Sequence, residues 1–410
     1  MPVQGLRDTS NFATNERPEN WRQMLLYLYP NGKLPLTALT SAMKEESTDD
    51  PVFHWWELAL DDRRLALGQN LAASAAGTIE TWTLAGGSNA LTFVANDILV
   101  VEQTDEQVRL YADPTSNTAI TVVRGANGTT PAAVTYTAAG INPNILCIGS
   151  SFEEGSLAPT GVNYDPTERY NYTQIFRRTL EITRTASKTR LRTVPAVKEA
   201  RRQCLEYIGV DMERAFWLGI RSSGVRNGKP VRTTAGIYNQ MAAGNIYSIS
   251  GGTLDMDTLE TYLELVFREG SSEKMVFCGN KGLMAINQVV RKNSQYQIKG
   301  GEKEFGMNVT RLTCPFGDLV FKTHPLFTQV TGGTTSSVAY YAMNTSMFIL
   351  DMENISYRYL KESDLQYQGD LAAVGQDAMK SGYIAECGIE LHHPSTHFLL
   401  KNVNRGAEDI

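Results

Sequence analysis

The 410-residue sequence predicts an α+β fold in which a small all-β unit is distinct from a larger unit of helices and strands. Three observations predict it. Short β-branched runs separated by Gly, Asn, Asp and Pro fill residues 78–148. An apolar stripe at spacings of three and four marks one long helix at 195–220. Helix and strand patterns then alternate over 253–292, and strands predominate after them.

Composition and charge limit the classes of protein. The chain is 42% hydrophobic and 20% charged, as is usual for soluble globular proteins. A net charge of −6 argues against a protein that coats nucleic acid with most of its surface. We expect neither a transmembrane helix nor a signal peptide, because no long apolar run is present and the N-terminus is polar. The five scattered cysteines lie in apolar contexts and are expected to be buried free thiols.

The first half of the chain is expected to be mostly extended. Residues 1–55 predict an N-terminal arm, because prolines divide its short apolar patches and such a segment buries little alone. The run "VFHWWELALDDRRLAL" predicts a connecting helical segment at 56–77. The small β unit follows at 78–148, and "TLEITRT" and "KTRLRT" predict long exposed strands within 149–193.

The second half contains the clearest helices. Pro195 suits the first turn of the long helix, where a missing N–H does no harm. Asp257 and Glu260 form an acidic capping box for a shorter helix, which Gly270 ends. "EKMVFCG" predicts a buried strand, and "GLMAINQVVRK" another helix. The apolar stripe of the long helix consists of Val197, Ala200, Cys204, Ile208, Met212, Ala215 and Gly219.

Three of the five histidines lie in "LHHPSTHFLL", so a metal site has to be weighed. Neighbouring His392 and His393 on a strand point to opposite faces. His393 and His397 on one strand would be roughly 13 Å apart, too far to share a zinc ion. "HPSTH" lacks the glutamate of HExxH, and Pro394 favours a turn. We therefore expect strand-end histidines beside a turn, and no metal site.

Other motifs for chemistry are weak. "GVRNGKP" has its first glycine at the wrong distance for a phosphate loop, and Pro230 replaces the residue that holds magnesium. "GNKG" at 279–282 suits an anion cradle or an RNA-binding GXXG loop, but a helix-start turn is the more ordinary explanation. No GxSxG, GxGxxG or Ser/His/Asp set is present, and Glu153 and Glu154 diverge in an extended segment. We expect no catalytic residue and no cofactor.

One charge pattern rises above background: nine cations and two anions lie between residues 177 and 202. A solvated face, contact with DNA phosphates and pairing with another copy remain open. We expect it to hold neighbouring subunits, with the acidic end of the arm, "KEESTDDP", as a candidate complement. The candidate interface residues are Arg177, Arg178, Arg184, Lys188, Arg190, Arg192, Glu45, Glu46, Asp49 and Asp50.

The order of parts resembles the tailed-bacteriophage major capsid proteins of the Hong Kong 97-type fold, in the variant with a small β-domain inserted near the E-loop. The residues that carry this resemblance are "ITVVRGANGTTPAA", "EEG", "YNYTQIF", "DMERAFWLGIRSSG", "RTTAGI", "CPFGDLVF" and "CGIELHHPSTHFLL". The resemblance implies an N-arm at 1–55, the inserted β-domain at 78–148, an E-loop at 149–193, a spine helix of the P-domain at 194–227, an A-domain at 228–345, and P-domain strands at 346–410.

The resemblance also implies a function. Pentamers and hexamers of the chain would form the icosahedral head around packaged double-stranded DNA, after synthesis in the bacterial cytoplasm. The tip of the A-domain is expected near "KNSQYQIKGGEKEFG". Since no charged helical N-terminal segment resembles a fused scaffold, a separate scaffolding protein is implied, together with a portal protein. A tail or decoration protein and a cytosolic nucleic-acid-binding protein remain alternatives.

Overall fold

The structure is a computed structural model that describes residues 43–136, 143–189, 195–249, 254–292, 298–304, 307–328 and 340–404. It divides into two compact units. Unit 1 comprises Met1–Trp55 and Arg169–Ile410, and unit 2 comprises Trp56–Glu168. Strands β2 (Val52–Glu57) and β9 (Thr167–Tyr172) pair where the chain passes between the units. No helix within the described ranges is long and apolar enough to cross a membrane.

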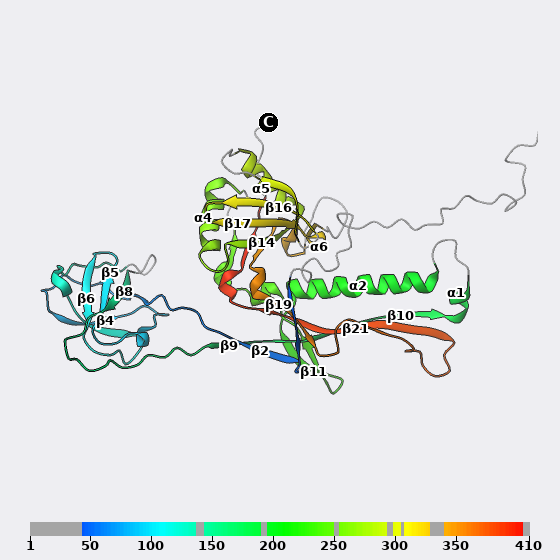
Figure 1. The fold of residues 1–410 in the computed structure, drawn as a ribbon, viewed down its shortest axis with the longest axis horizontal. Coiled ribbons are helices and arrows are strands. Elements are labelled where there is room, and N and C mark those ends of the chain that lie inside the picture. The colour runs from blue at the N-terminus through cyan, green and yellow to red at the C-terminus, as the bar shows by residue number, and fades with distance from the viewer. Residues whose placement is uncertain are drawn as a thin grey trace, which may run out of the picture. The chain divides into compact units, whose positions relative to one another are not determined.

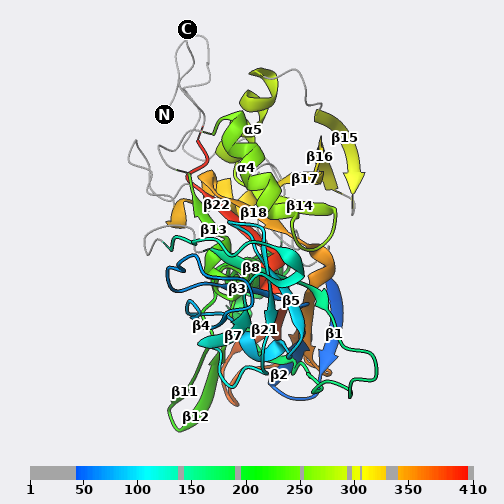
Figure 2. The same ribbon diagram turned by 90° about the vertical axis from the view of Figure 1, so that its left-hand side faces the viewer.

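Unit 2 is a six-stranded antiparallel sheet that closes on itself (Figures 1 and 2). The strand order is β3 (Arg64–Ala66), β8 (Asn144–Ser150), β5 (Asp97–Val101), β6 (Glu106–Leu110), β7 (Ala119–Val123) and β4 (Ile79–Thr83). The outer strands meet through a bridge between Leu67 and Leu84 and a 2.9 Å bond from the Gly68 N–H to the Thr83 carbonyl. Closure removes both sheet edges at that end, and alternate residues such as Val108 and Val122 fill the interior.

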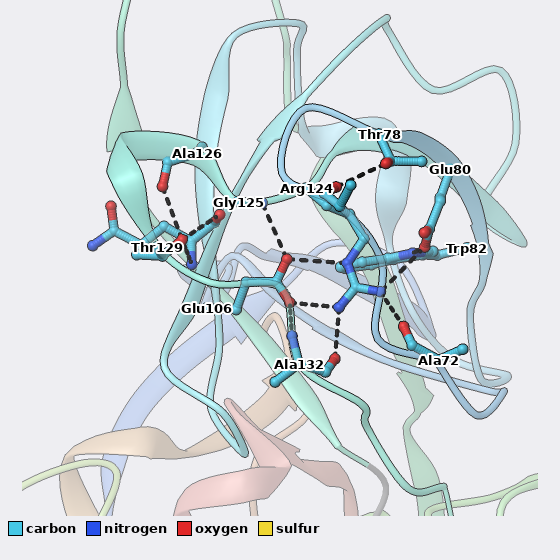
Figure 3. Close-up of polar contacts among 12 residues, drawn as sticks. Ala72, Thr78, Glu80, Trp82, Glu106, Arg124, Gly125, Ala126, Thr129 and Ala132 are labelled. Carbon is cyan, nitrogen blue, oxygen red and sulfur yellow. Dashed lines mark hydrogen bonds and ion pairs between the residues drawn. The ribbon is translucent and has the colours of Figure 1, made fainter.

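An ion pair buried in unit 2 holds three of its segments (Figure 3). The Arg124 side chain is fully buried, and its Nη2 and Nε donate to Glu106 at 2.6 and 3.0 Å. Arg124 also donates to the carbonyls of Ala72, at 2.5 Å, and Ala132, at 2.6 Å, and its guanidinium lies over the Trp82 ring. The Glu106 hydrogen bond raises the pKa of Arg124 further, so the arginine is charged inside the barrel.

The prediction of a helical segment at 56–77 is wrong. This stretch contains β3 and the bridging residues Leu67 and Leu71, and none of it is helical. Leu65 and Leu67 are 1% and 0% exposed although they are two residues apart, which places both on one face of an extended chain. The leucine-rich sequence permits a helix. The chain is extended instead, because a period of two places the side chains of Leu65 and Leu67 together inside the barrel.

The first sheet of unit 1 carries the long helix (Figure 1). Its strand order is β1 (Lys44–Thr48), β19 (Ile355–Leu360), β21 (Ala378–Leu391) and β10 (Gln174–Thr183), with β20 (Gln366–Gln368) also paired to β21. Helix α2 (Ala196–Leu218) packs along β10 and β21. The strand predicted at "TLEITRT" is therefore part of this sheet, whereas most of "KTRLRT" lies outside the described residues.

Helix α2 confirms the 195–220 predicted from the apolar stripe and is shorter than the 194–227 that the resemblance implies for the spine helix. Pro195 is its N-cap, and Gly219 ends it where a Cβ would lie 2.5 Å from the Thr234 carbonyl. The chain then forms a hairpin of β11 (Ser222–Arg226) and β12 (Lys229–Thr233) instead of more helix. The stripe is confirmed in part: Cys204 and Ile208 are buried, and Met212 and Ala215 pack on the same core.

The second sheet of unit 1 is mixed and has seven strands: β13 (Ile246–Ser248), β22 (Phe398–Lys401), β18 (Met347–Leu350), β14 (Glu273–Cys278), β17 (Gly317–Thr323), β16 (Met307–Cys314) and β15 (Ile298–Glu304). Val276 packs with α4 (Met256–Phe267) and α5 (Asn280–Lys292), and Phe277 packs with α2. The predicted buried strand is confirmed, because both faces of β14 are covered. The remaining helices are α1 (Arg184–Lys188), α3 (Ile237–Gln240) and α6 (Pro325–Thr328).

The start of α4 differs from the prediction. Asp255 is its N-cap and accepts a 2.9 Å bond from the Thr258 N–H, so the expected box of Asp257 and Glu260 is wrong. That hydrogen bonding lowers the pKa of Asp255. Gly270 follows the helix with φ of 89°, as predicted for a stop. The expected A-domain tip lies partly outside the described residues, at 293–297 and 305–306.

Candidate assembly interface

Three motifs of the sequence meet at one buried amide beside the end of α2. The Asn171 side chain, from "YNYTQIF", is 0% exposed. Its Nδ2 donates to the Ile389 carbonyl at 2.7 Å and to the Ala235 carbonyl at 3.1 Å. Its Oδ1 accepts from the Ala235 N–H at 2.9 Å. The Asn171 side chain therefore joins three parts of the chain: β9, β21, and the segment that follows β12. These bonds hold the base of the β11–β12 hairpin in place.

Close backbone packing surrounds this amide. A Cβ on Gly236, from "RTTAGI", would lie 2.7 Å from the Ala215 carbonyl and 2.8 Å from the Leu218 N. Gln240 donates to the Ala235 carbonyl at 2.8 Å, and Asn239 donates to the Gly219 carbonyl at 2.6 Å. The Asn239 side chain thus satisfies carbonyls left open where α2 ends.

The histidine-rich stretch is a turn between two strands, as predicted. β21 ends at Leu391, a short 3-10 helix covers Pro394–Thr396, and β22 follows. The buried His397 accepts at Nδ1 from the Asp351 N–H at 3.3 Å, and its Nε2 donates to the His392 carbonyl at 3.2 Å. Both ring nitrogens are occupied by backbone groups. No cluster of three or more potential metal-binding side chains occurs among the described residues.

Burial lowers the pKa of His397 to about 4. The unfolded chain binds this proton below its ordinary pKa of about 6.5, whereas the folded chain binds it only below about 4. Stability is therefore lost as pH falls between these values, by up to about 3 kcal/mol.

We expect His397→Gln to flatten the acid side of the stability profile relative to wild type, measured by denaturant unfolding of unassembled chain from pH 7 to 4. The exposed His54→Gln is the control, with a wild-type slope. Parallel profiles for wild type and His397→Gln would contradict the assignment.

A charged network holds the end of the arm to this turn. Glu390 is 2% exposed, lies 2.5 Å from His392 Nε2, and accepts from Arg358, which reaches Glu46 at 2.6 Å. Burial raises the pKa of Glu390, but bonds from His392 and Arg358 outweigh it and hold that pKa below its usual value. Because β1 and β19 are parallel neighbours, the acidic end of the arm is anchored on its own chain.

The other acidic candidates also lie on this anchored strand or just after it. Asp49 lies 4.0 Å from Lys361, and Asp50 accepts a 2.8 Å bond from the Val52 N–H. Glu45 is exposed.

The basic candidates are spread over β10 and α1. Arg178 pairs with Asp211 at 2.6 Å, and Arg184 pairs with Asp377 at 2.8 Å. Arg177 reaches Gln368 at 3.5 Å, and Lys188 ends α1 on the surface. Arg190 and Arg192 lie outside the described residues. Within the described ranges the acidic and basic candidates do not meet, so their pairing between subunits stays a prediction.

Two buried polar contacts were missed by sequence reasoning. Lys274 Nζ donates to the carbonyls of Val266, Glu269 and Thr396 at 2.7–2.8 Å, and burial lowers the pKa of Lys274 to about 8. His324 lies 2.8 Å from Glu213, which connects α2 to the end of β17. The signal in the sequence was a charge within an apolar run, as in "EKMVFC", which indicates a buried partner for that charge.

The "GNKG" stretch begins α5 as a helix-start turn. Asn344 Oδ1 accepts from the Lys281 N–H at 3.2 Å. A Cβ on Gly279 would lie 2.5 Å from the Asn344 Cα. The close approach of the Asn344 backbone explains why residue 279 is a glycine. The Asn344 side chain caps the Lys281 amide, so this amide already has a partner within the chain.

In unit 1 a long helix lies along extended strands, a second sheet is mixed, and the described end of the arm pairs at the edge of the first sheet. The chain belongs to the SU10 major capsid protein family, whose model matches residues 7–404. It is a virion component.

Individual relatives are distant. A major capsid protein of Pseudomonas phage PaMx41 is 26% identical over 319 residues, which cover 75% of this chain and 72% of that protein. A structure from Mycobacterium phage Bobi covers 96% of both chains at 10% identity, with a TM-score of 0.44. The capsid of a native GTA particle covers 94% of this chain and 95% of its own at 9% identity, with a TM-score of 0.45.

Proposed function

We propose that many copies of this chain assemble as pentamers and hexamers into a closed icosahedral head that encloses packaged double-stranded DNA. The family match over residues 7–404 carries the proposal. In this role the activity is association, and the chain needs no catalytic residue or cofactor. A separate scaffolding protein would guide assembly, a portal protein would occupy one vertex, and DNA would face the inner surface.

The parts of the subunit divide this work. We assign the P-domain to α2 with the sheet of β10, β19 and β21, and the A-domain to the seven-stranded sheet. The barrel of unit 2 is proposed as an insertion at the end of the E-loop, whose two arms are the chain segments that flank it. β10 is hydrogen bonded to β21 over residues 174–183, which favours an E-loop that ends before β10 instead of at 193.

Electron microscopy of the purified full chain tests the proposal, with and without the co-expressed scaffolding protein. Closed shells of uniform diameter are expected. Tubes would favour a tail protein, and monodisperse small particles under both conditions would exclude a shell protein.

The basic candidates allow a second test. We expect Arg190→Glu with Arg192→Glu to prevent closed shells, because charge reversal replaces attraction between subunits by repulsion. The control is Arg268→Glu, an exposed arginine at the end of α4. Shells that form normally from the double variant, counted by negative-stain microscopy, would show that these arginines do not join subunits.

A further inference from the structure

A cleft of about 270 Å³ opens within unit 1 at the base of the β11–β12 hairpin. Figures 1 and 2 show the hairpin itself projecting from the sheets of this unit. Two arginines, Arg169 and Arg221, and two side-chain amides, Asn239 and Gln240, line the cleft. Among the described residues that line it, none is an aspartate or a glutamate. The lining is therefore formally positive, which favours an anionic ligand.

The Arg221 guanidinium is held in position by the protein itself. Its Nη1 donates to the Tyr170 carbonyl at 2.7 Å, and its Cζ lies 3.9 Å from the centre of the Tyr170 ring. Its Nε and Nη2 donate to no acceptor in the part of the chain that the structure describes. A guanidinium carries five N–H donors in a planar fork that matches the oxygens of a phosphate. Arg221 therefore offers an anion more than one charged donor without rearrangement.

The two amides supply acceptors to the same cleft. Asn239 Nδ2 donates to the Gly219 carbonyl at 2.6 Å, and Gln240 Nε2 donates to the carbonyls of Ala235 and Ile389 at 2.8 and 3.2 Å. Because these partners are carbonyls, only the NH₂ group of each amide can point toward them. Asn239 Oδ1 and Gln240 Oε1 accept from no donor within the described ranges. The cleft thus combines fixed cationic donors with fixed neutral acceptors.

We propose that this cleft binds inorganic phosphate, with charged oxygens at Arg221 and a P–O–H group donating to the amide oxygen of Asn239 or Gln240. Inorganic phosphate keeps at least one O–H at neutral pH, so it donates as well as accepts. Sulfate and the phosphodiester of DNA have no O–H. Either would set its negative oxygens against the amide oxygens and leave these acceptors without a donor. This difference favours free phosphate over sulfate and over nucleic acid.

Phosphate bound here would brace the base of the hairpin. Arg221 directly precedes β11, whereas Asn239 and Gln240 end α3, so one anion would connect the two elements. A ligand that binds only the folded chain raises its stability by mass action. We therefore expect phosphate to raise the unfolding midpoint of unassembled chain more than sulfate does, although both salts also stabilise proteins by exclusion from their surfaces. The site needs no second copy, so it is independent of the proposed shell.

Titration calorimetry of the unassembled full chain at pH 7 tests the ligand. Inorganic phosphate, sulfate and dimethyl phosphate, which mimics the DNA backbone, are titrated separately at matched ionic strength. We expect one phosphate to bind per chain with a Kd of about 1 mM or lower, and the other two anions to bind about tenfold more weakly or not at all. Absence of saturable phosphate binding, or equal affinity for the three anions, would overturn the proposal.

A matched pair of substitutions locates the site. Ile220 lines the cleft and is 66% exposed, so its replacement leaves the core intact. Ile220→Glu places a carboxylate beside the anion and is expected to weaken phosphate binding about tenfold or more, whereas the uncharged Ile220→Gln should stay within about twofold of wild type. Arg221→Gln should abolish binding, and Arg226→Gln, at a hairpin cation outside the cleft, should not change it. Equal affinities in the two Ile220 variants would place the phosphate elsewhere, and that result stands even if Arg221→Gln fails to fold.

Discussion

Replacing Arg124 with methionine is expected to lower the free energy of unfolding of unit 2 by about 3–5 kcal/mol. The change removes the bonds to Glu106 and to the carbonyls of Ala72 and Ala132. Glu106 is 1% exposed and would be left as an uncompensated charge inside the barrel. Hydrogen exchange of the full chain, followed by mass spectrometry on peptides from β5 to β7, measures the effect because it reports on unit 2 alone.

Two variants make this prediction specific. Arg109→Met removes a neighbouring arginine, which is only partly buried and donates to Asn96 at 2.7 Å, and should cost no more than about 1 kcal/mol. Arg124→Met with Glu106→Leu should recover part of the loss, since it replaces both buried charges with apolar groups. If the barrel amides are as well protected in Arg124→Met as in Arg109→Met, the ion pair is not what holds the segments together.

The arrangement of the barrel could be predicted only in part. The short β-branched runs and their period of two are enough by themselves to indicate a separate β unit. The role of Arg124 was not predictable, because Glu106 and Ala72 are 18 and 52 residues away from it in sequence and their meeting depends on the closure of the barrel. The leucines at 65 and 67 show the same limit: their pattern suits helix or strand, and tertiary packing decides.

The long helix shows where local signals suffice. Its stripe and the proline at its start located α2 within a few residues. Its predicted end at residue 220 lies two residues beyond the observed end at Leu218. Only the range to 227 that the resemblance implies overruns the helix, because Gly219 contacts the Thr234 carbonyl, a partner 15 residues later that no propensity encodes. Likewise the sequence indicates only that Lys274 is a charged residue in a strand. It does not indicate that the carbonyls of Val266 and Thr396 accept hydrogen bonds from its Nζ.

The candidate interface was least predictable. A run of like charges reveals a basic segment, but it does not reveal which cations already have partners. Asp211 and Asp377 each neutralise an arginine of the predicted stripe from another element.

Asn171→Asp is expected to destabilise unit 1 by about 3 kcal/mol or more at pH 7, although the two side chains have almost the same shape. The oxygen that replaces Nδ2 would face the carbonyls of Ile389 and Ala235, which accept hydrogen bonds from the amide in wild type. The site is fully buried, so water cannot offset the new charge. Denaturant unfolding of unassembled chain, followed by tryptophan fluorescence, measures the loss.

The pH dependence distinguishes this explanation from a general loss of packing. Burial and the facing carbonyls favour the protonated acid, so the folded variant has a pKa at this residue above the unfolded value of about 3.9. The folded variant then binds the proton first as pH falls, and its deficit relative to wild type should shrink between pH 7 and 5. Asn402→Asp, at an exposed amide that donates to Ser248, should change stability by about 0.5 kcal/mol or less at both pH values. A deficit for Asn171→Asp that stays constant with pH would mean that Asn171 matters for its shape and not as the donor that joins the three motifs.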